Sequence, residues 1–225
     1  MIEGKSSQCD PHDAPSATFN SSNIQLRQHA TSTARNGMKP DRRALIAASA
    51  VTIIAEQGPR ALTHRAVDQS LELPAGSTSY YFRTREALLE ATALHIVHRS
   101  RSIFDELRER PSDPAALTAE YLDDLLSHRR HELIARYALL LETPRDSALH
   151  QLLEDSLFSR EKARPVFDII GVDDPDVAAE NFLSLLEGLI FDYCLGARSR
   201  DPRSSETVRQ LRIPIDIYLR GVGAA

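Results

Sequence analysis

Three helical segments crowded into about forty residues constrain this chain more than any other feature. The first segment places Ile46, Ala50, Ile53 and Ile54 at helical spacing and stops at Gly58-Pro59. A second helix begins at Thr63, a residue type that caps helices well. After a break at residues 72–74, a very short third helix runs from Ala75 to about Tyr81. A long fourth helix then starts with Thr84 as its cap.

This spacing is typical of a helix-turn-helix, in which the third helix must protrude far enough to enter a DNA major groove about 12 Å wide. Residues 75–81 are all small or aromatic-polar. Small residues let the backbone approach base edges, and Tyr hydroxyls can donate to phosphate. The alternative is an ordinary helical bundle, which predicts longer helices and a buried third helix.

The rest of the chain also has helical periodicity, and no segment alternates as a strand would. We therefore expect an all-α protein with an N-terminal three-helix helix-turn-helix domain at residues 39–90 and a helical ligand-binding and dimerisation domain at 91–225. Residues 1–38 are rich in Ser, Asn, Gln, Thr and Pro and are expected to form a disordered leader. Two hypotheses stand for this leader: translation starts at Met38, or Arg35 and Lys39 belong to a real arm that reaches DNA. The expected later helices are 84–109, 114–128, 130–143, 145–164, 175–196 and 204–220.

Charge and composition narrow the possible partners. The chain has a net charge of −5, yet residues 35–85 hold eight basic and four acidic side chains, a local excess that suits phosphate binding. No apolar run approaches the length of a membrane span, and no secretory signal is evident. The two cysteines, Cys9 and Cys194, are far apart, which suits a reducing compartment. We expect a cytoplasmic protein that does not bind membranes.

The stretch from Arg43 to Leu89 resembles the N-terminal signature of the tetracycline-repressor (TetR) family. The segments that carry the resemblance are Ala61-Leu-Thr63-His-Arg-Ala-Val67 and Pro74-Ala-Gly76-Ser-Thr-Ser-Tyr-Tyr-Phe82. The resemblance covers about fifty residues. It implies a transcriptional regulator that binds palindromic operator DNA as a homodimer and is released by a small-molecule effector of unknown identity, most simply as a repressor.

Carried over position by position, the resemblance implies DNA contacts from the second and third helices and from the start of the fourth. The residues concerned are Thr63, His64, Arg65, Ala75, Gly76, Ser77, Tyr80, Tyr81, Arg83 and Arg85. Three positions depart from the family pattern. Glu72 stands where a turn Gly is usual, which costs about 1 kcal/mol if the site needs a positive φ; Ser79 replaces a frequent Tyr, and Arg85 replaces the usual Lys.

The resemblance also implies a ligand pocket between the middle helices and a four-helix dimer interface built by the last two. We expect an apolar pocket with scattered Tyr hydroxyls, lined by Ile103, Tyr121, Leu125, Tyr137, Leu141 and Phe167. The expected interface residues are Phe182, Leu185, Leu186, Leu189, Tyr193, Leu211, Ile215 and Tyr218. For both sets the competing interpretation is that the residues belong to the core within one subunit.

No enzyme motif is found: the chain has no Gly-rich phosphate loop, nucleophile elbow or His-Glu-x-x-His, so we expect no catalysis and no cofactor. His95 and His98 lie three residues apart on one helix, and His128 and His131 repeat the spacing, but no cysteine or carboxylate cluster completes a site, and no metal is expected. An alternative function is a helical ligand-binding or scaffold dimer that does not bind DNA, for which Glu72 is the best argument.

Overall fold

Helices form all the regular structure in the part of the chain that the computed structural model describes, which is residues 41–110, 113–202 and 204–223. The expected all-α class is confirmed there. In chain order the elements are α2 (Arg42–Gln57), the 3₁₀ turn η1 (Pro59–Ala61), α3 (His64–Ser70), α4 (Ser77–Tyr81), α5 (Arg85–Arg108), α6 (Pro114–Ser127), α7 (Arg130–Glu142), α8 (Ala148–Glu154), α9 (Arg160–Ile170), α10 (Pro175–Cys194), the 3₁₀ turn η2 (Ala197–Arg200) and α11 (Ser205–Gly223).

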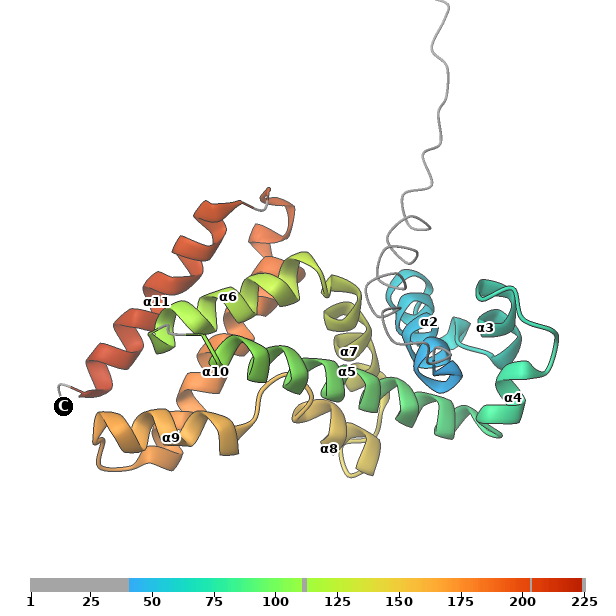
Figure 1. Ribbon diagram of the computed structural model, residues 1–225, viewed down its shortest axis with the longest axis horizontal. Coiled ribbons are helices and arrows are strands. Elements are labelled where there is room, and N and C mark those ends of the chain that lie inside the picture. Colours follow the sequence, from blue (N-terminus) through green and yellow to red (C-terminus); the bar gives the residue numbers. More distant parts are fainter. Residues whose placement is uncertain (1–40, 111–112, 203, 224–225) are drawn as a thin grey trace, which may run out of the picture. The chain divides into compact units, whose positions relative to one another are not determined.

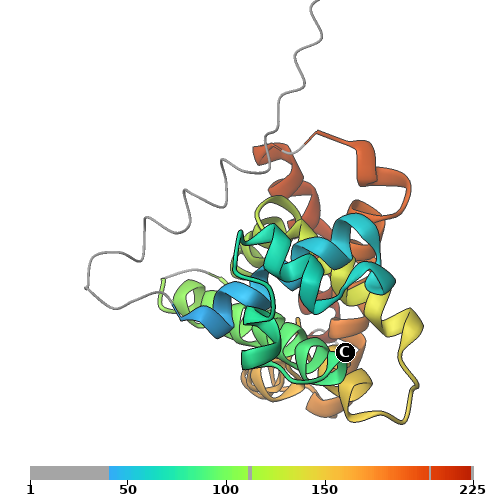
Figure 2. The same ribbon diagram turned by 90° about the vertical axis from the view of Figure 1, so that its right-hand side faces the viewer.

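The short helices α3 and α4 lie together with α2 at one end of this helical unit, and α9 and α11 lie at the other (Figure 1). Figure 2 looks onto the end that carries α2–α4. The helix α5 starts beside α4 and runs toward the opposite end. Both α5 and α7 pack against α2, so the helix-turn-helix rests on the helices that follow it.

Side-chain caps explain where most of these helices begin. The hydroxyl of Thr63 accepts from the N–H of Ala66 at 3.0 Å, and that of Thr84 accepts from the N–H of Ala87 at 3.1 Å. Carboxylates of Asp113 and Asp174 cap α6 and α10, each directly before a proline. The helix starts expected at Thr63 and Thr84 are therefore confirmed.

The prediction of one helix over residues 145–164 is wrong, because the structure has α8 and α9 with a break between them. Serine side chains cause the break. The hydroxyl of Ser156 donates to the carbonyl of Leu153 at 2.6 Å, and the hydroxyl of Ser159 caps the new helix at Lys162. Such side chains offer the backbone an alternative to continued helix, which apolar periodicity alone does not reveal.

A continuous apolar core runs through the described residues, from Ile46 and Ile54 of α2 to Leu211 and Ile215 of α11. Those residues belong to one compact unit that begins at Asp41. The expected boundary between residues 90 and 91 falls inside α5 and remains a prediction. The expected leader, residues 1–38, lies outside the described residues.

Candidate DNA-binding surface and ligand cavity

A buried carboxylate joins the two short helices. Asp68 of α3 is almost fully buried and accepts three hydrogen bonds: from the N–H of Gly76 at 2.8 Å, the N–H of Thr78 at 2.8 Å and the hydroxyl of Thr78 at 2.6 Å. Burial acts to raise the pKa of Asp68, but the bonds from Thr78 and Gly76 outweigh it and hold the pKa below its ordinary value. The charged carboxylate thus fixes the start of α4 against α3.

These bonds also explain why α4 begins at Ser77 rather than at Ala75. Gly76 is in the left-handed region, with φ 88°, and serves as the N-cap residue. A side chain is poorly tolerated at this φ, so glycine suits the position. In the turn before it, Glu72 is the sole non-glycine residue with positive φ among the described residues, at 52°. The condition under which Glu72 carries a strain cost is therefore met.

The helix α4 presents most of its surface to solvent. The Tyr80 side chain is 82% exposed, and Ala75, Gly76 and Ser79 are also exposed. Ser77 and Tyr81 are half-buried, and the Tyr81 ring meets that of Tyr80 edge-on at 5.2 Å. Only Thr78 is buried, where it bonds to Asp68. This arrangement leaves one face of α4 open to solvent.

The basic side chains predicted to contact phosphate surround α4, but they are not equally available. Arg65 and Arg83 are exposed, as is Thr63. Arg85 is exposed too, yet its guanidinium donates to the carbonyl of Pro59 at 2.7 Å. A ring nitrogen of His64 lies 2.7 Å from the carbonyl of Phe82, and so this side chain connects α3 to the residue that ends α4.

Arg43, which the motif reasoning left unassigned, lies with its guanidinium 4.7 Å from the centre of the Phe82 ring. It joins α2 to the end of α4. The sequence signal for it was the pair Arg42-Arg43 at the start of the first helix.

A cavity of about 230 Å³ lies at the other end of the unit, between α5, α6, α9 and α10. Each helix contributes one face: α5 supplies Ser100, Phe104 and Arg108 at helical spacing, and α6, α9 and α10 do the same. Four aromatic rings line it. The Phe104 ring meets that of Tyr121 at 5.7 Å, and the Tyr121 ring meets that of Phe158 at 6.1 Å. The remaining lining residues include Arg101, Leu117, Thr118, Asp155, Leu157, Ser159, Lys162, Ala163, Val166, Phe182, Leu183 and Leu186.

Of the six residues predicted to line a pocket, only Tyr121 lines this cavity. Leu125 and Phe167 are fully buried in the core, and Leu141 is 89% exposed. Tyr137 donates to Glu187 at 3.1 Å, and Ile103 packs against the core beside the cavity. The cavity forms where α5 faces α9, and spacing within one helix does not tell which helix it will face.

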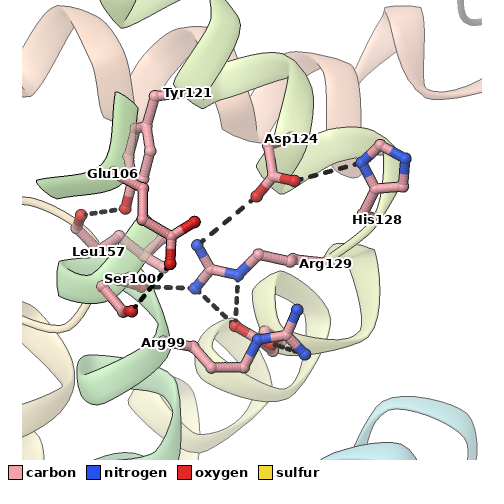
Figure 3. A network of polar contacts seen from close by, with 10 residues as sticks. Arg99, Ser100, Glu106, Tyr121, Asp124, His128, Arg129 and Leu157 are labelled. Atoms are coloured by element: carbon pink, nitrogen blue, oxygen red, sulfur yellow. Dashed lines mark hydrogen bonds and ion pairs between the residues drawn. The ribbon is translucent and has the colours of Figure 1, made fainter. Parts of the chain in front are cut away.

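A buried polar network centred on Arg129 includes Ser100, which also lines the cavity (Figure 3). Arg129, fully buried between α6 and α7, donates to the Glu132 carboxylate at 2.6 and 2.8 Å and to the Ser100 hydroxyl at 2.6 Å. Its Nη1 atom makes no hydrogen bond and lies 4.0 Å from the Asp124 carboxylate. Glu132 also pairs with Arg99 at 3.2 Å. Because Ser100 lines the cavity and α7 packs against α2, this network lies between the cavity and the helix-turn-helix.

Tyr121 reaches both the cavity and this region. Its hydroxyl donates to the carbonyl of Leu157 at 2.7 Å, and burial raises its pKa. The side chain therefore stays neutral and holds the loop after α8 against α6.

Most residues predicted for a dimer interface are buried within this chain. Phe182 and Leu186 line the cavity, and Tyr193, Leu211 and Ile215 belong to the core. Leu189 is also buried, while Leu185 and Tyr218 are half-buried. The last two helices nevertheless expose a different apolar stripe, which we call the α10–α11 stripe: Val177, Gly188, Phe191, Leu195, Ile213 and Ile217. Its sequence signal was the spacing 177, 188, 191, 195 together with the isoleucine pair four residues apart.

Metal-ligand clusters and membrane-spanning helices are both absent from the described ranges. No group of three or more His, Cys, Asp or Glu side chains there is placed to hold a metal ion. Nor does any helix of those ranges have the length and apolarity to cross a membrane.

Comparison with known proteins relates part of this chain to a family model and its fold to several solved structures. Residues 109–212 match the family model described as the tetracyclin repressor-like C-terminal domain. No curated protein matches the chain by sequence. Among solved structures, a transcriptional regulator from Rhodococcus sp. Rha1 is 22% identical, with a TM-score of 0.66 over 82% of this chain and 100% of its own.

Two further structures have the same fold. A transcriptional regulator from Streptomyces coelicolor A3(2) is 23% identical, with a TM-score of 0.59 over 80% of this chain and 99% of its own. The multidrug binding protein EbrR, complexed with malachite green, is 20% identical, with a TM-score of 0.59 over 80% of this chain and 98% of its own. At these identities the likeness establishes a shared fold.

Proposed function

We propose that this chain is a TetR-family transcriptional regulator that binds a palindromic operator as a homodimer and is released from it by a small molecule. The observation that carries the proposal is the exposure of α4. Its open face holds Tyr80 at 82% exposure; Arg65 of the neighbouring helix α3 and Arg83, which follows α4 in the chain, are exposed too. A buried helix in this position would have left no surface for a major groove.

The cavity supports the ligand-responsive part of the proposal. It lies between α5, α6, α9, α10 and the segment 155–159, and its lining is mainly apolar and aromatic, as small-molecule sites usually are. At about 230 Å³ it suits a small ligand rather than a drug-sized one. EbrR, a relative in fold, is described as a multidrug binding protein and was solved with a ligand, which supports the same use of the fold here.

Homodimerisation rests on the α10–α11 stripe. Phe191 and Ile213 are each at least half exposed, and Ile217 is 66% exposed. Exposed apolar side chains that line up along two adjacent helices are costly in water and are usually covered by a partner. A second copy related by two-fold symmetry covers such a stripe and presents two copies of α4 to DNA. Successive half-sites lie about 34–36 Å apart, so both copies must hold that separation to bind together.

The coupling route that we propose runs through α5 and the Arg129 network. Ligand in the cavity contacts Ser100 and Phe104 of α5, and the first turn of α5 follows α4 directly. A ligand that prefers one tilt of α5 shifts the separation of the two DNA-binding ends. A difference in affinity between the two states of about 1–3 kcal/mol is typical of such coupling. Repression is the simpler outcome, because a bound dimer obstructs a promoter.

DNA binding is tested by fluorescence anisotropy on a labelled duplex from the region upstream of the chain's own gene. We expect the anisotropy to rise as protein is added, and the rise should depend on the palindrome and weaken with salt. Replacing Arg83 with Ala should weaken binding about three- to tenfold on all sequences and reduce the salt slope by about one, as loss of a phosphate contact does. Arg83 is a cleaner probe than Arg85, whose bond to Pro59 also supports the fold.

The matched control is Arg145→Ala, which removes an exposed arginine between α7 and α8. It should leave the anisotropy curve unchanged. A folded dimer that binds no duplex from this region would instead favour the scaffold function, to which the strain at Glu72 lends some support.

A further inference from the structure

The charged side chains around the cavity favour one chemical class of ligand. The lining includes three cationic side chains, Arg101, Arg108 and Lys162, against one carboxylate, Asp155. Arg101 and Arg108 are exposed, so they lie where the cavity meets solvent. Neither of the two forms an ion pair with any described residue. The rim of the cavity is therefore positively charged.

The third cation, Lys162, lies within the mouth. Its side chain is 27% exposed, lies 5.7 Å from the centre of the Phe104 ring and pairs with the carboxylate of Asp105. Asp105 belongs to α5 and Lys162 to α9, so this ion pair joins the two helices that face each other across the cavity. A carboxylate is thus already the partner of Lys162 in the unliganded protein.

The deep end of the cavity has the opposite character. Three of its hydroxyl groups already donate to backbone carbonyls: Thr118 to Pro114 at 2.7 Å, Tyr121 to Leu157 at 2.7 Å and Ser156 to Leu153 at 2.6 Å. Around them are Phe104, Phe158, Phe182 and Leu186. These hydroxyl donors already have partners, so the deep end provides few hydrogen bonds for an anionic group. It provides many apolar contacts for an aromatic or aliphatic body.

We propose, as a deepening of the ligand-responsive function above, that the cavity takes a small apolar carboxylate. Its aromatic or aliphatic body lies among the rings of the deep end. Its carboxylate lies at the rim, where it displaces Asp105 from Lys162 and meets Arg101 or Arg108. This choice differs from the ligand of EbrR named above, because malachite green is a cation and the rim here repels cations.

The experiment compares three probes of one shape: 4-phenylbutanoate, 4-phenylbutan-1-ol and 4-phenylbutylammonium. Their affinities for the full chain are measured by isothermal titration calorimetry at pH 7. We expect the carboxylate to bind at least tenfold more tightly than the alcohol and the ammonium to bind most weakly. Equal binding of the three probes, tightest binding of the ammonium, or no binding of the carboxylate overturns the proposal.

Opposite responses of the two halves of one ion pair make the test specific. Lys162→Gln should weaken binding of the carboxylate probe about tenfold and leave binding of the alcohol probe unchanged. Asp105→Asn should strengthen binding of the carboxylate probe about threefold, because the Asp105 carboxylate no longer competes for Lys162. If the ion pair had only a structural role, both variants would change the affinity for the carboxylate probe in the same direction. That result would refute the proposed displacement of Asp105 by the ligand.

Two further variants locate the site and control for charge. Ala163→Trp fills the cavity and should abolish binding of the carboxylate, whereas Arg145→Gln removes a positive charge elsewhere and should not change it. Carboxylate binding that survives Ala163→Trp in a folded protein overturns the assignment to this cavity. DNA binding of the unliganded protein is measured separately, so the regulator can stand while the ligand class fails, and the reverse.

Discussion

At the scale of single residues, two side chains in the helix-turn-helix have opposite effects on stability. Glu72 holds a left-handed backbone that an L side chain adopts at a cost, whereas Asp68 gathers three hydrogen bonds around one buried carboxylate. Both are short-range features, and each leads to a prediction that concerns one position.

Replacing Glu72 with Gly should stabilise the protein by about 1 kcal/mol, because glycine adopts a positive φ without steric cost. Chemical denaturation followed by circular dichroism measures the change. The matched control is Gln69→Gly, at an exposed position within α3, which should lose up to about 1 kcal/mol. If both glycines destabilise the protein alike, the strain at Glu72 is not real.

Replacing Asp68 with Asn should cost about 2 kcal/mol at pH 7, since hydrogen bonds to the charged carboxylate are lost. The folded-state pKa of Asp68 lies below its ordinary value. Its stabilising effect is thus fully present above the unfolded pKa, about 4, and disappears as the pH falls through the lower folded pKa.

Denaturation curves of the wild type and Asp68→Asn at pH 7, 4 and 3 should therefore converge toward acid. Glu56→Gln, at an exposed carboxylate in α2, provides the control and should show no such convergence. A stability gap that is as wide at pH 3 as at pH 7 would contradict the assignment.

At the scale of elements, the Arg129 network determines how α5, α6 and α7 meet. Its guanidinium touches Ser100 of α5, approaches Asp124 of α6 and pairs with Glu132 of α7. Burial acts to lower the pKa of Arg129, but Glu132 raises it above its ordinary value, so the cation remains charged.

Replacing Glu132 with Ala should destabilise the protein by about 3–5 kcal/mol, because it leaves a buried cation without its partner. Arg99→Ala removes only the half-exposed cation of the cluster and should cost at most about 1 kcal/mol. The double variant Arg129→Met with Glu132→Leu should recover much of the stability, as apolar replacement of a buried pair often does. A double variant that is less stable than Glu132→Ala would count against this account.

The same scale shows why some elements could be predicted from sequence and others could not. Thr63 and Thr84 act on neighbours three residues away, so local spacing was enough to locate their helices. The cavity depends on α5 and α9 facing each other, through residues such as Asp105 and Lys162 that lie far apart in the chain. Periodicity reveals that a helix has an apolar face but not which partner covers it.

At the scale of the whole molecule, the same ambiguity explains the dimer prediction. Phe182 and Leu186 lie on an apolar face of α10, but the cavity and core occupy that face. The α10–α11 stripe lies on another face, and Gly188 makes it smooth. A Cβ atom added at Gly188 would meet nothing within 4 Å in the single chain.

Replacing Gly188 with Arg should therefore leave the folded subunit intact and dissociate the proposed dimer, because a charged side chain would enter the proposed interface between the copies. Analytical ultracentrifugation and circular dichroism together measure this. Gln151→Arg, on the exposed side of α8, serves as the control and should remain dimeric. Dimers that persist in Gly188→Arg would place the interface elsewhere.

The unbroken length of α5 has a mechanical consequence. Its 24 residues contain neither glycine nor proline and extend about 36 Å at 1.5 Å per residue. Such a rod transmits tilt without absorbing it. A rotation of about 5° pivoting near Arg108 moves the Arg85 end by about 3 Å, comparable to a base-pair rise of about 3.4 Å. If the proposed function holds, a ligand at one end of α5 can thereby change the position of α4 at the other.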